Sequence, residues 1–201
     1  QRDFLPADIP QIPGWEIDTC FHPARQVSGD FYDVFMLPGN YVGLVIADVC
    51  DKGVGSALYM ALFRSLIRVF SGQIRLGVWS AAKASKNKDA VSETDLTRML
   101  QAVSLTNDYI AEEHGHEVMF ATVFFGVLNP ATGDLSFVNG GHEPPFIIGQ
   151  SKIKDTLTAQ GPVVGIIPGA EFEIQHTQLE PGDILIGYTD GVTEALSPQE
   201  A

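Results

Sequence analysis

The sequence contains few cysteines and few basic residues, and both shortages exclude classes of protein. It has 2 cysteines, Cys20 and Cys50, among 201 residues, too few for a disulfide framework or a cysteine-based zinc site. The 12 Lys and Arg residues against 25 Asp and Glu residues give a net charge of −13. Because no basic cluster is present, we expect neither nucleic acid nor an anionic membrane surface as a partner.

Long apolar runs are also missing from the sequence. No uninterrupted apolar stretch approaches the roughly 18 residues that a membrane span requires. The chain begins at Gln1 without a recognisable signal peptide. We therefore expect no membrane insertion and, because the cysteines are unpatterned, a reducing compartment, the cytoplasm. Apolar residues make up 45% of the chain, enough for one large globular domain.

The most informative stretch is residues 41–60, YVGLVIADVCDKGVGSALYM. Its first part is a short apolar run, which is typical of a strand buried on both faces and which ends at Asp48. A glycine-punctuated turn follows, and apolar residues then recur at helical spacing over residues 56–70. The predicted buried face of this helix consists of Leu58, Leu62, Leu66 and Val69, widened by Met60, Phe63 and Ile67.

Two further acids follow the same pattern. Residues 184–188 form a second apolar strand that runs into Asp190-Gly191, and Asp30 lies in a third strand-associated segment. Divalent cations such as Mg²⁺ prefer carboxylate oxygens, so three such acids in one domain indicate a shared metal site. A simple turn remains the alternative for any one of them, because Asp and Gly are common turn residues.

The remaining segments complete an α+β pattern of strands, two helices and more strands. Ser92 and Asp95 form a predicted capping box that opens a helix ending near Gly115. Residues 71–92 are interpreted as a connection, because they show little periodicity. Further strands are predicted at residues 15–21, 31–37, 119–128, 135–138, 146–148 and 171–178.

Six segments, taken together and in this order, resemble a known family. They are FLPADIPQIPGW (4–15), PARQVSGDFYDVF (23–35), IADVCDKGVGSALYM (46–60), FATVFFGVLNPATG (120–133), NGGHEPP (139–145) and PGDILIGYTDGVTEA (181–195). The family is the metal-dependent protein phosphatases of the PPM class, and the chain is most similar to the bacterial SpoIIE/RsbU-type serine phosphatases. The resemblance implies a sandwich of two antiparallel sheets with helices on the outer faces. It also implies that residues 1–14 end an N-terminal linker and that residues 15–201 form the phosphatase domain.

The resemblance assigns roles to individual positions. Asp48 matches the acid that bridges two Mn²⁺ or Mg²⁺ ions, and Val49 matches the neighbour whose backbone carbonyl faces a metal. Asp190 matches a ligand of one ion. Asp30 matches an acid that orients the reacting water, and Arg25 matches a phosphate-binding arginine. These five residues are the expected metal and catalytic site.

The resemblance also implies a function and partners. The expected activity is a phosphatase acting on phosphoserine or phosphothreonine of a bacterial regulatory protein, with a STAS-type anti-sigma-factor antagonist as the leading candidate. An upstream sensory or receiver domain in the same polypeptide is expected to control it, and a homodimer is left open. Two alternatives stand beside this hypothesis. One is a catalytically weak or inactive PPM-like module that only binds a partner; the other is a metal-dependent phosphodiesterase or nuclease, which the shortage of basic residues disfavours.

One departure from the family concerns the C-terminal end. Family members continue past the TDG segment into a helix and a last strand that supplies another aspartate, whereas this sequence stops at Ala201. Gly29 stands where the family has a glutamate. We therefore expect the C-terminal part of the fold to be missing and metal binding to be weak, with Asp48 and Asp190 still close. Their mutual repulsion should raise the pKa of at least one of them.

Two residues near these motifs are not assigned to the chemistry. His142, in a loop of glycines and prolines, is interpreted as structural rather than catalytic. Cys50 is interpreted as a buried, inert thiol.

Overall fold

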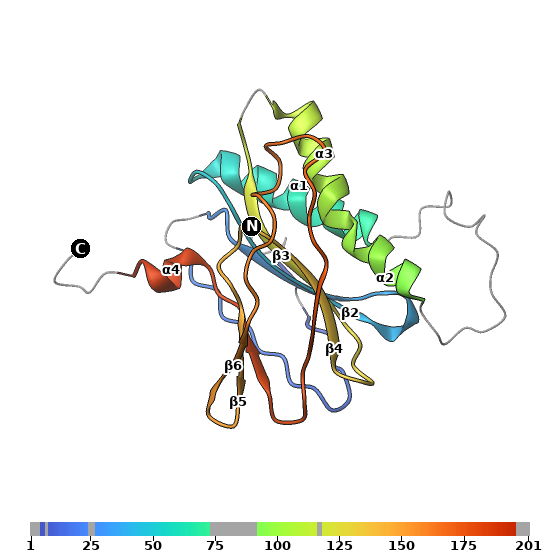
Figure 1. Cartoon of the computed structure of the whole chain (residues 1–201). Helices are drawn as coiled ribbons and strands as arrows, with labels where there is room; N and C mark the ends of the chain where they lie inside the picture. Colours follow the sequence, from blue (N-terminus) through green and yellow to red (C-terminus); the bar gives the residue numbers. More distant parts are fainter. Residues whose placement is uncertain (1–4, 7, 24–26, 73–91, 116–117, 196–201) are drawn as a thin grey trace.

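Two antiparallel sheets pack face to face, and helices cover the outer face of the larger sheet (Figure 1). The computed structural model describes residues 5–6, 8–23, 27–72, 92–115 and 118–195. Its elements are β1 (Phe31–Met36), η2 (Pro38–Asn40), β2 (Val42–Val49), α1 (Val54–Phe70), α2 (Glu93–Leu100), α3 (Ala102–Glu113), β3 (Ala121–Leu128), β4 (Asp134–Gly140), β5 (Phe146–Gly149), β6 (Lys152–Thr156), β7 (Gln175–Gln178), β8 (Ile184–Ile186) and α4 (Asp190–Thr193). This is the α+β pattern that the sequence predicts, arranged as the sandwich that the family resemblance implies.

The larger sheet has the strand order β1-β2-β3-β4-β7, and the smaller sheet has the order β6-β5-β8. Strand β2 pairs antiparallel with β1 on one side and with β3 on the other. This central place explains its apolar sequence, since both Val42 and Ala47 are 0% exposed. In the register, Asp48 lies opposite Thr122 of β3.

The alternation of side chains along β2 divides them between two cores. Val45, Ala47 and Val49 belong to the core beneath the helices. Leu44 and Ile46 belong to the core between the two sheets. Asp48 has the same parity as Ile46, so its carboxylate lies at the end of the space between the sheets.

Helix α1 is tied to the larger sheet by a buried ion pair. Asp33 of β1 is 1% exposed and lies within 2.9 Å of Arg64 and 2.5 Å of Arg68, both on α1. Arg68 also lies over the ring of Phe35, 4.8 Å from its centroid. A buried carboxylate requires such partners, so Asp33 fixes the position of α1 along β1.

The predicted buried face of α1 is confirmed in part, because Met60, Phe63 and Ile67 are buried but none of Leu58, Leu62, Leu66 and Val69 is fully buried. Its buried residues are Ser56, Met60, Phe63 and Ile67, whereas Leu58 is 67% exposed. Apolar residues occur on more than one stripe of this helix. The ion pair with Asp33 and packing against the sheet select which stripe is turned inward.

Three other predictions differ in detail. Residues 15–21 form no strand; Trp15 and Ile17 pack against the core between the sheets, so their alternation reflects burial without ladder pairing. The predicted helix is divided at Gln101 into α2 and α3, although its capping box is confirmed. Strand β6 was not predicted, and all five of its residues are exposed. Most of the connection predicted at residues 71–92 lies outside the described residues.

The N-terminal segment contacts both cores where the structure describes it. Leu5 joins the core beneath the helices, and Ile12 joins the core between the sheets. A cavity of about 1020 Å³ lies between residues 13–19 and β8; Ile46 and Gly187 line it, but none of the three site acids does. Among the described residues, no helix is long and apolar enough to cross a membrane.

Candidate metal centre

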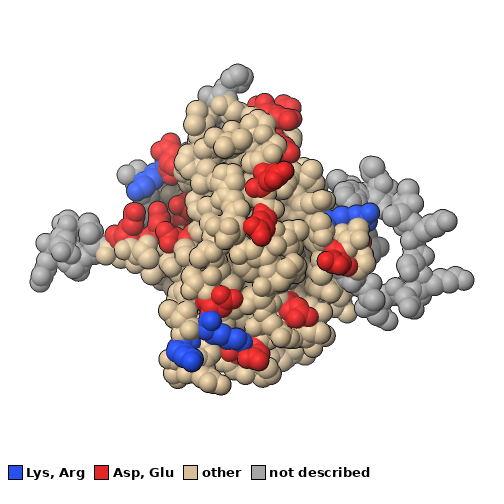
Figure 2. Space-filling view, in the orientation of Figure 1, with Lys and Arg blue, Asp and Glu red and all other residues tan. Residues whose placement is uncertain are grey.

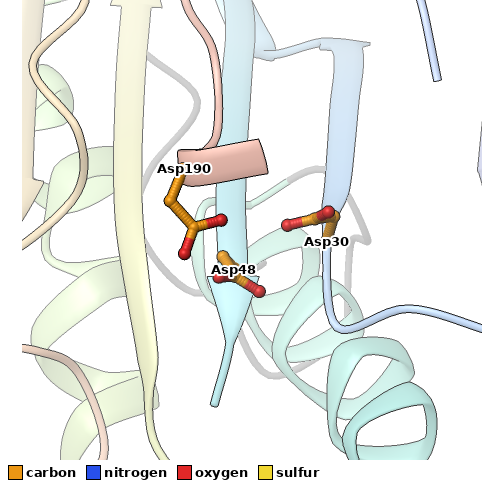
Figure 3. A group of neighbouring side chains, drawn as sticks. All are labelled: Asp30, Asp48 and Asp190. Carbon is orange, nitrogen blue, oxygen red and sulfur yellow. The ribbon is translucent and has the colours of Figure 1, made fainter. Parts of the chain in front are cut away.

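Three acidic side chains from three separate elements meet at one end of the sandwich. Asp30 immediately precedes β1, Asp48 lies near the end of β2, and Asp190 opens α4. A carboxylate oxygen of each lies within 4.8 Å of the others, and Figure 3 shows the carboxylates pointing toward one another. The structure thus brings together three of the residues that the sequence singles out.

Asp30 and Asp48 are placed by the pairing of their strands, whereas Asp190 lies on an exposed segment. The pairing of β1 with β2 places Asp30 level with Asp48, since Phe31 pairs with Ala47. The Ser28 hydroxyl donates to a carboxylate oxygen of Asp30 at 3.1 Å. Asp190 is exposed, because α4 has only four residues and none of them is buried.

Burial, together with neighbouring negative charge, raises the pKa of Asp48 from 3.8 to about 7. Burial of the carboxyl contributes most, followed by the charge of Asp30 and a hydrogen bond with it. Asp190 contributes less, and the positive charge of Lys52 acts in the opposite direction. The expected rise is confirmed, but burial and Asp30 contribute more to it than Asp190 does.

These residues fit a hard divalent cation. Three carboxylates within a few ångströms are the ligand type that Mg²⁺ and Mn²⁺ prefer, and a cation would relieve the repulsion that raises the pKa of Asp48. Figure 2 shows acidic groups gathered on the side of the molecule where α4 lies. The described residues therefore include a group suited to binding a metal ion.

The Val49 carbonyl has a close neighbour that explains the glycine at position 29. A Cβ added to Gly29 would lie 2.2 Å from the Val49 carbonyl oxygen and 2.8 Å from the Ser56 hydroxyl. No side chain fits there unless the Val49 carbonyl moves. The role of this carbonyl as a metal ligand stays a prediction, and Arg25 lies outside the described residues.

Two neighbours of the site were not assigned to it from the sequence. His142 is 3% exposed, and its Nδ1 lies 2.8 Å from the Thr122 hydroxyl, opposite Asp48 on β3. Burial lowers the pKa of His142 to about 4, while the Tyr188 backbone and the charge of Asp190 act to raise it. The NGGHEPP segment carried the only sequence signal for this residue.

Comparison with known proteins agrees with this architecture. The SpoIIE family (Stage II sporulation protein E) matches residues 38–201. Protein IcfG of Synechocystis sp. (strain ATCC 27184 / PCC 6803 / Kazusa) is 50% identical over 202 residues, which cover 98% of this chain and 32% of that protein. Phosphoserine phosphatase RsbU of Bacillus subtilis (strain 168) is 28% identical over 198 residues, covering 96% of this chain and 51% of RsbU. The chain spans between a third and about half of the length of these relatives.

Solved structures show the same fold at low identity. The PP2C phosphatase domain of SpoIIE from Bacillus subtilis, solved with a fragment of its regulatory domain, aligns with a TM-score of 0.62 at 19% identity, covering 85% of this chain and 43% of that chain. The S. agalactiae serine/threonine phosphatase aligns with a TM-score of 0.62 at 17% identity, covering 89% and 79%. Fold and acidic site together define a PP2C-like domain. The chain belongs to the SpoIIE family.

Proposed function

We propose that this chain is a metal-dependent protein phosphatase that hydrolyses phosphoserine or phosphothreonine. The observation that carries the proposal is the meeting of Asp30, Asp48 and Asp190 within 4.8 Å at one end of the sandwich. The family adds support, because the relatives RsbU and RsbP of Bacillus subtilis, each 28% identical, are named phosphoserine phosphatases. Residues 15–201 are the proposed catalytic unit, following a linker that ends at residue 14.

In this proposal, Asp48, the Val49 carbonyl and Asp190 hold Mn²⁺ or Mg²⁺. Such ions, when bound, lower the pKa of a coordinated water and polarise phosphoryl oxygens. Asp30, positioned by Ser28, orients the attacking water and receives its proton. The water oxygen would attack phosphorus, the bond from phosphorus to the serine oxygen would break, and that oxygen would take up a proton from solvent, while Asp30 would return to solvent the proton that it received. The products are inorganic phosphate and unmodified serine.

Arg25 is proposed to bind the phosphate before the reaction. A guanidinium presents paired N–H donors that match phosphate oxygens, and lysine at the same position lacks this geometry. Arg25→Lys and Arg25→Ala should therefore both raise KM for a phosphoprotein more than they lower kcat. An unchanged KM in both variants would contradict this role.

The proposed substrate is a phosphorylated STAS-type regulator, and the proposed compartment is the cytoplasm. Control by an upstream sensory or receiver domain of the same polypeptide belongs to the same hypothesis. The relatives IcfG and RsbU are about two to three times as long as this chain, which leaves room in such proteins for a further domain.

Phosphate release from a phosphoserine STAS-domain protein in Mn²⁺ tests the function. The wild type and Asp155→Asn, a control that neutralises an exposed acid of β6, should be active. Asp48→Ala should be inactive. Release that survives Asp48→Ala at saturating Mn²⁺ would refute the proposed site. Binding of the phosphoprotein without turnover would favour the inactive partner-binding module, and cleavage of a cyclic dinucleotide or DNA instead would favour a phosphodiesterase.

A further inference from the structure

Asp30 and Asp48 are direct neighbours across the antiparallel ladder of β1 and β2. Phe31 pairs with Ala47, and one further step along both strands places Asp30 opposite Asp48 at the end of the ladder (Figure 3). Opposite residues of such a ladder have their Cβ atoms about 4.5–5.5 Å apart, and like charges in this position destabilise the pairing. Other contacts at this end of the ladder must therefore hold the two strands together.

The next pair along the ladder, Gly29 and Val49, supplies a close contact between the two backbones. The Val49 N–H donates to the Gly29 carbonyl at 3.3 Å. The Val49 carbonyl oxygen occupies the side of Gly29 where a side chain would begin, because a Cβ added there would lie only 2.2 Å from it. Real Cβ atoms essentially never lie within 3.0 Å of such an atom, so a side chain at position 29 would force the two backbones apart by about 0.8 Å.

The first turn of α1 closes the remaining side of Gly29. Side chains alternate along the ladder, and Val49 belongs to the core beneath the helices, so position 29 faces that core while the two acids face the opposite side. Ser56 of α1 is 0% exposed, and its hydroxyl oxygen lies 2.8 Å from the position that a Gly29 Cβ would take.

Three elements therefore meet at a position that carries no side chain. They are the residues that lead into β1, the end of β2 and the start of α1. A Cβ at position 29 would meet a carbonyl group of β2 and a buried side chain of α1 at the same time. It could be accommodated only if β1 moved away from β2 or if α1 moved away from the sheet. The first of these movements separates Asp30 from Asp48.

We propose that Gly29 is a positioning residue, which by its lack of a side chain lets β1, β2 and α1 close together and so holds Asp30 opposite Asp48. This inference rests on the proposed function, because its consequence is the affinity of the proposed metal site. Gly29 contacts neither metal nor substrate in it, since its carbonyl accepts the Val49 N–H. It acts through the separation of the two strand ends and through the direction of the Val49 carbonyl.

Gly29→Ala tests this role with the smallest side chain that has a Cβ. It should weaken Mn²⁺ affinity about 10- to 100-fold, the usual effect of disturbing a residue that orients a metal ligand. Mn²⁺ titration followed by EPR measures weak as well as tight binding and requires no turnover. The melting temperature in EDTA, measured on the same samples, reports the loss of stability separately.

Two other glycines of the same sheet region provide matched controls. Gly133→Ala creates the same type of clash in the turn between β3 and β4, because its Cβ would lie 2.1 Å from the Leu179 carbonyl oxygen. Gly43→Ala lies in the β1–β2 ladder itself, where its Cβ would meet the ring of its paired residue Phe35 at 2.8 Å. Both variants should lower the melting temperature and leave Mn²⁺ affinity unchanged.

Position 56 tests the same contact from the helix side. Ser56→Cys places a larger atom against Gly29 and should weaken Mn²⁺ affinity about tenfold, the lower end of the range for such residues. Ser56→Ala removes the hydroxyl and should leave the affinity unchanged. If Gly29→Ala fails to fold, this pair of variants decides.

The outcomes distinguish this inference from the proposed function. Wild-type affinity in Gly29→Ala, with binding lost in Asp48→Asn, would overturn the positioning role and leave the metal site standing. Equal weakening in Gly29→Ala and Gly133→Ala would also overturn it, because stability alone would then control binding. If only the position 56 variants fold, equal affinity of Ser56→Cys and Ser56→Ala overturns the role. Equal affinity of wild type and Asp48→Asn would overturn the metal site itself.

Discussion

Replacing Asp48 by Asn in the metal-free protein tests the acidic site without any substrate. The pKa of Asp48 in the folded chain, about 7, lies above the ordinary value of 3.8. Between these pH values the folded state binds more protons than the unfolded state, so stability falls as the pH rises through this window. Above pH 7 the folded wild type carries an unfavourable charge that Asn lacks. We therefore expect Asp48→Asn to be more stable than the wild type at pH 8 in EDTA.

The size of the effect follows from the pKa shift. One pKa unit corresponds to about 1.4 kcal/mol, so the rise from 3.8 to about 7 sets an upper limit of about 4 kcal/mol. The Asp48 carboxyl is only partly buried, and solvent screening reduces the expected gain to about 1–2 kcal/mol. For a chain of 201 residues, that gain raises the melting temperature by roughly 2–8 °C.

Thermal unfolding in EDTA between pH 5 and pH 8 measures this gain, which should grow with pH up to about pH 7 and then level off. Excess Mn²⁺ should then stabilise the wild type, by about 2.7 kcal/mol at a concentration 100 times Kd, and leave the variant unchanged. Asp183→Asn is the control, because its contact with Lys154 lowers the pKa of Asp183 and neutralising it should stabilise the protein at no pH. Asp48→Asn that is no more stable than the wild type at pH 8 would refute the reasoning.

Three further predictions concern other parts of the molecule. Asp33→Ala leaves two arginines of α1 without their buried partner and should lower the free energy of unfolding by about 3–5 kcal/mol in denaturant unfolding. Arg98→Gln, the control, breaks an exposed pair and should lower it by less than about 1 kcal/mol. Equal losses in the two variants would contradict the importance of the buried pair. Asp190→Asn should weaken Mn²⁺ binding in a calorimetric titration while the melting temperature in EDTA changes little, because the residue is exposed; unfolding of this variant would show a structural role instead. Thiol titration at pH 7.5 should modify exposed Cys20 before Cys50, because burial raises the pKa of the Cys50 thiol, and the reverse order would refute that assignment.

The sequence alone determined the local elements and the identity of the acids. The apolar run ending in Asp48 predicted a central strand because only a strand covered on both faces buries so many consecutive apolar residues. The Ser92 capping box was confirmed because it depends only on residues three positions apart. The acid-ended strands, read with the family resemblance, predicted that Asp30, Asp48 and Asp190 share one site.

Tertiary structure decided what depends on distant partners. Apolar and polar residues alternate along residues 15–21 as they do in a strand, but the segment forms none. A strand requires a neighbouring backbone to pair with, whereas the alternation shows only which side chains are buried. The rise in the pKa of Asp48 comes mainly from burial and from Asp30, which lies next to Asp48 only through the pairing of β1 with β2. His142 lies twenty positions from Thr122 along the chain, so only the folding of the β4–β5 loop onto β3 brings the imidazole and the hydroxyl together. Sequence patterns report contacts along a strand or helix, whereas charge, burial and contacts between elements exist only after the elements have packed.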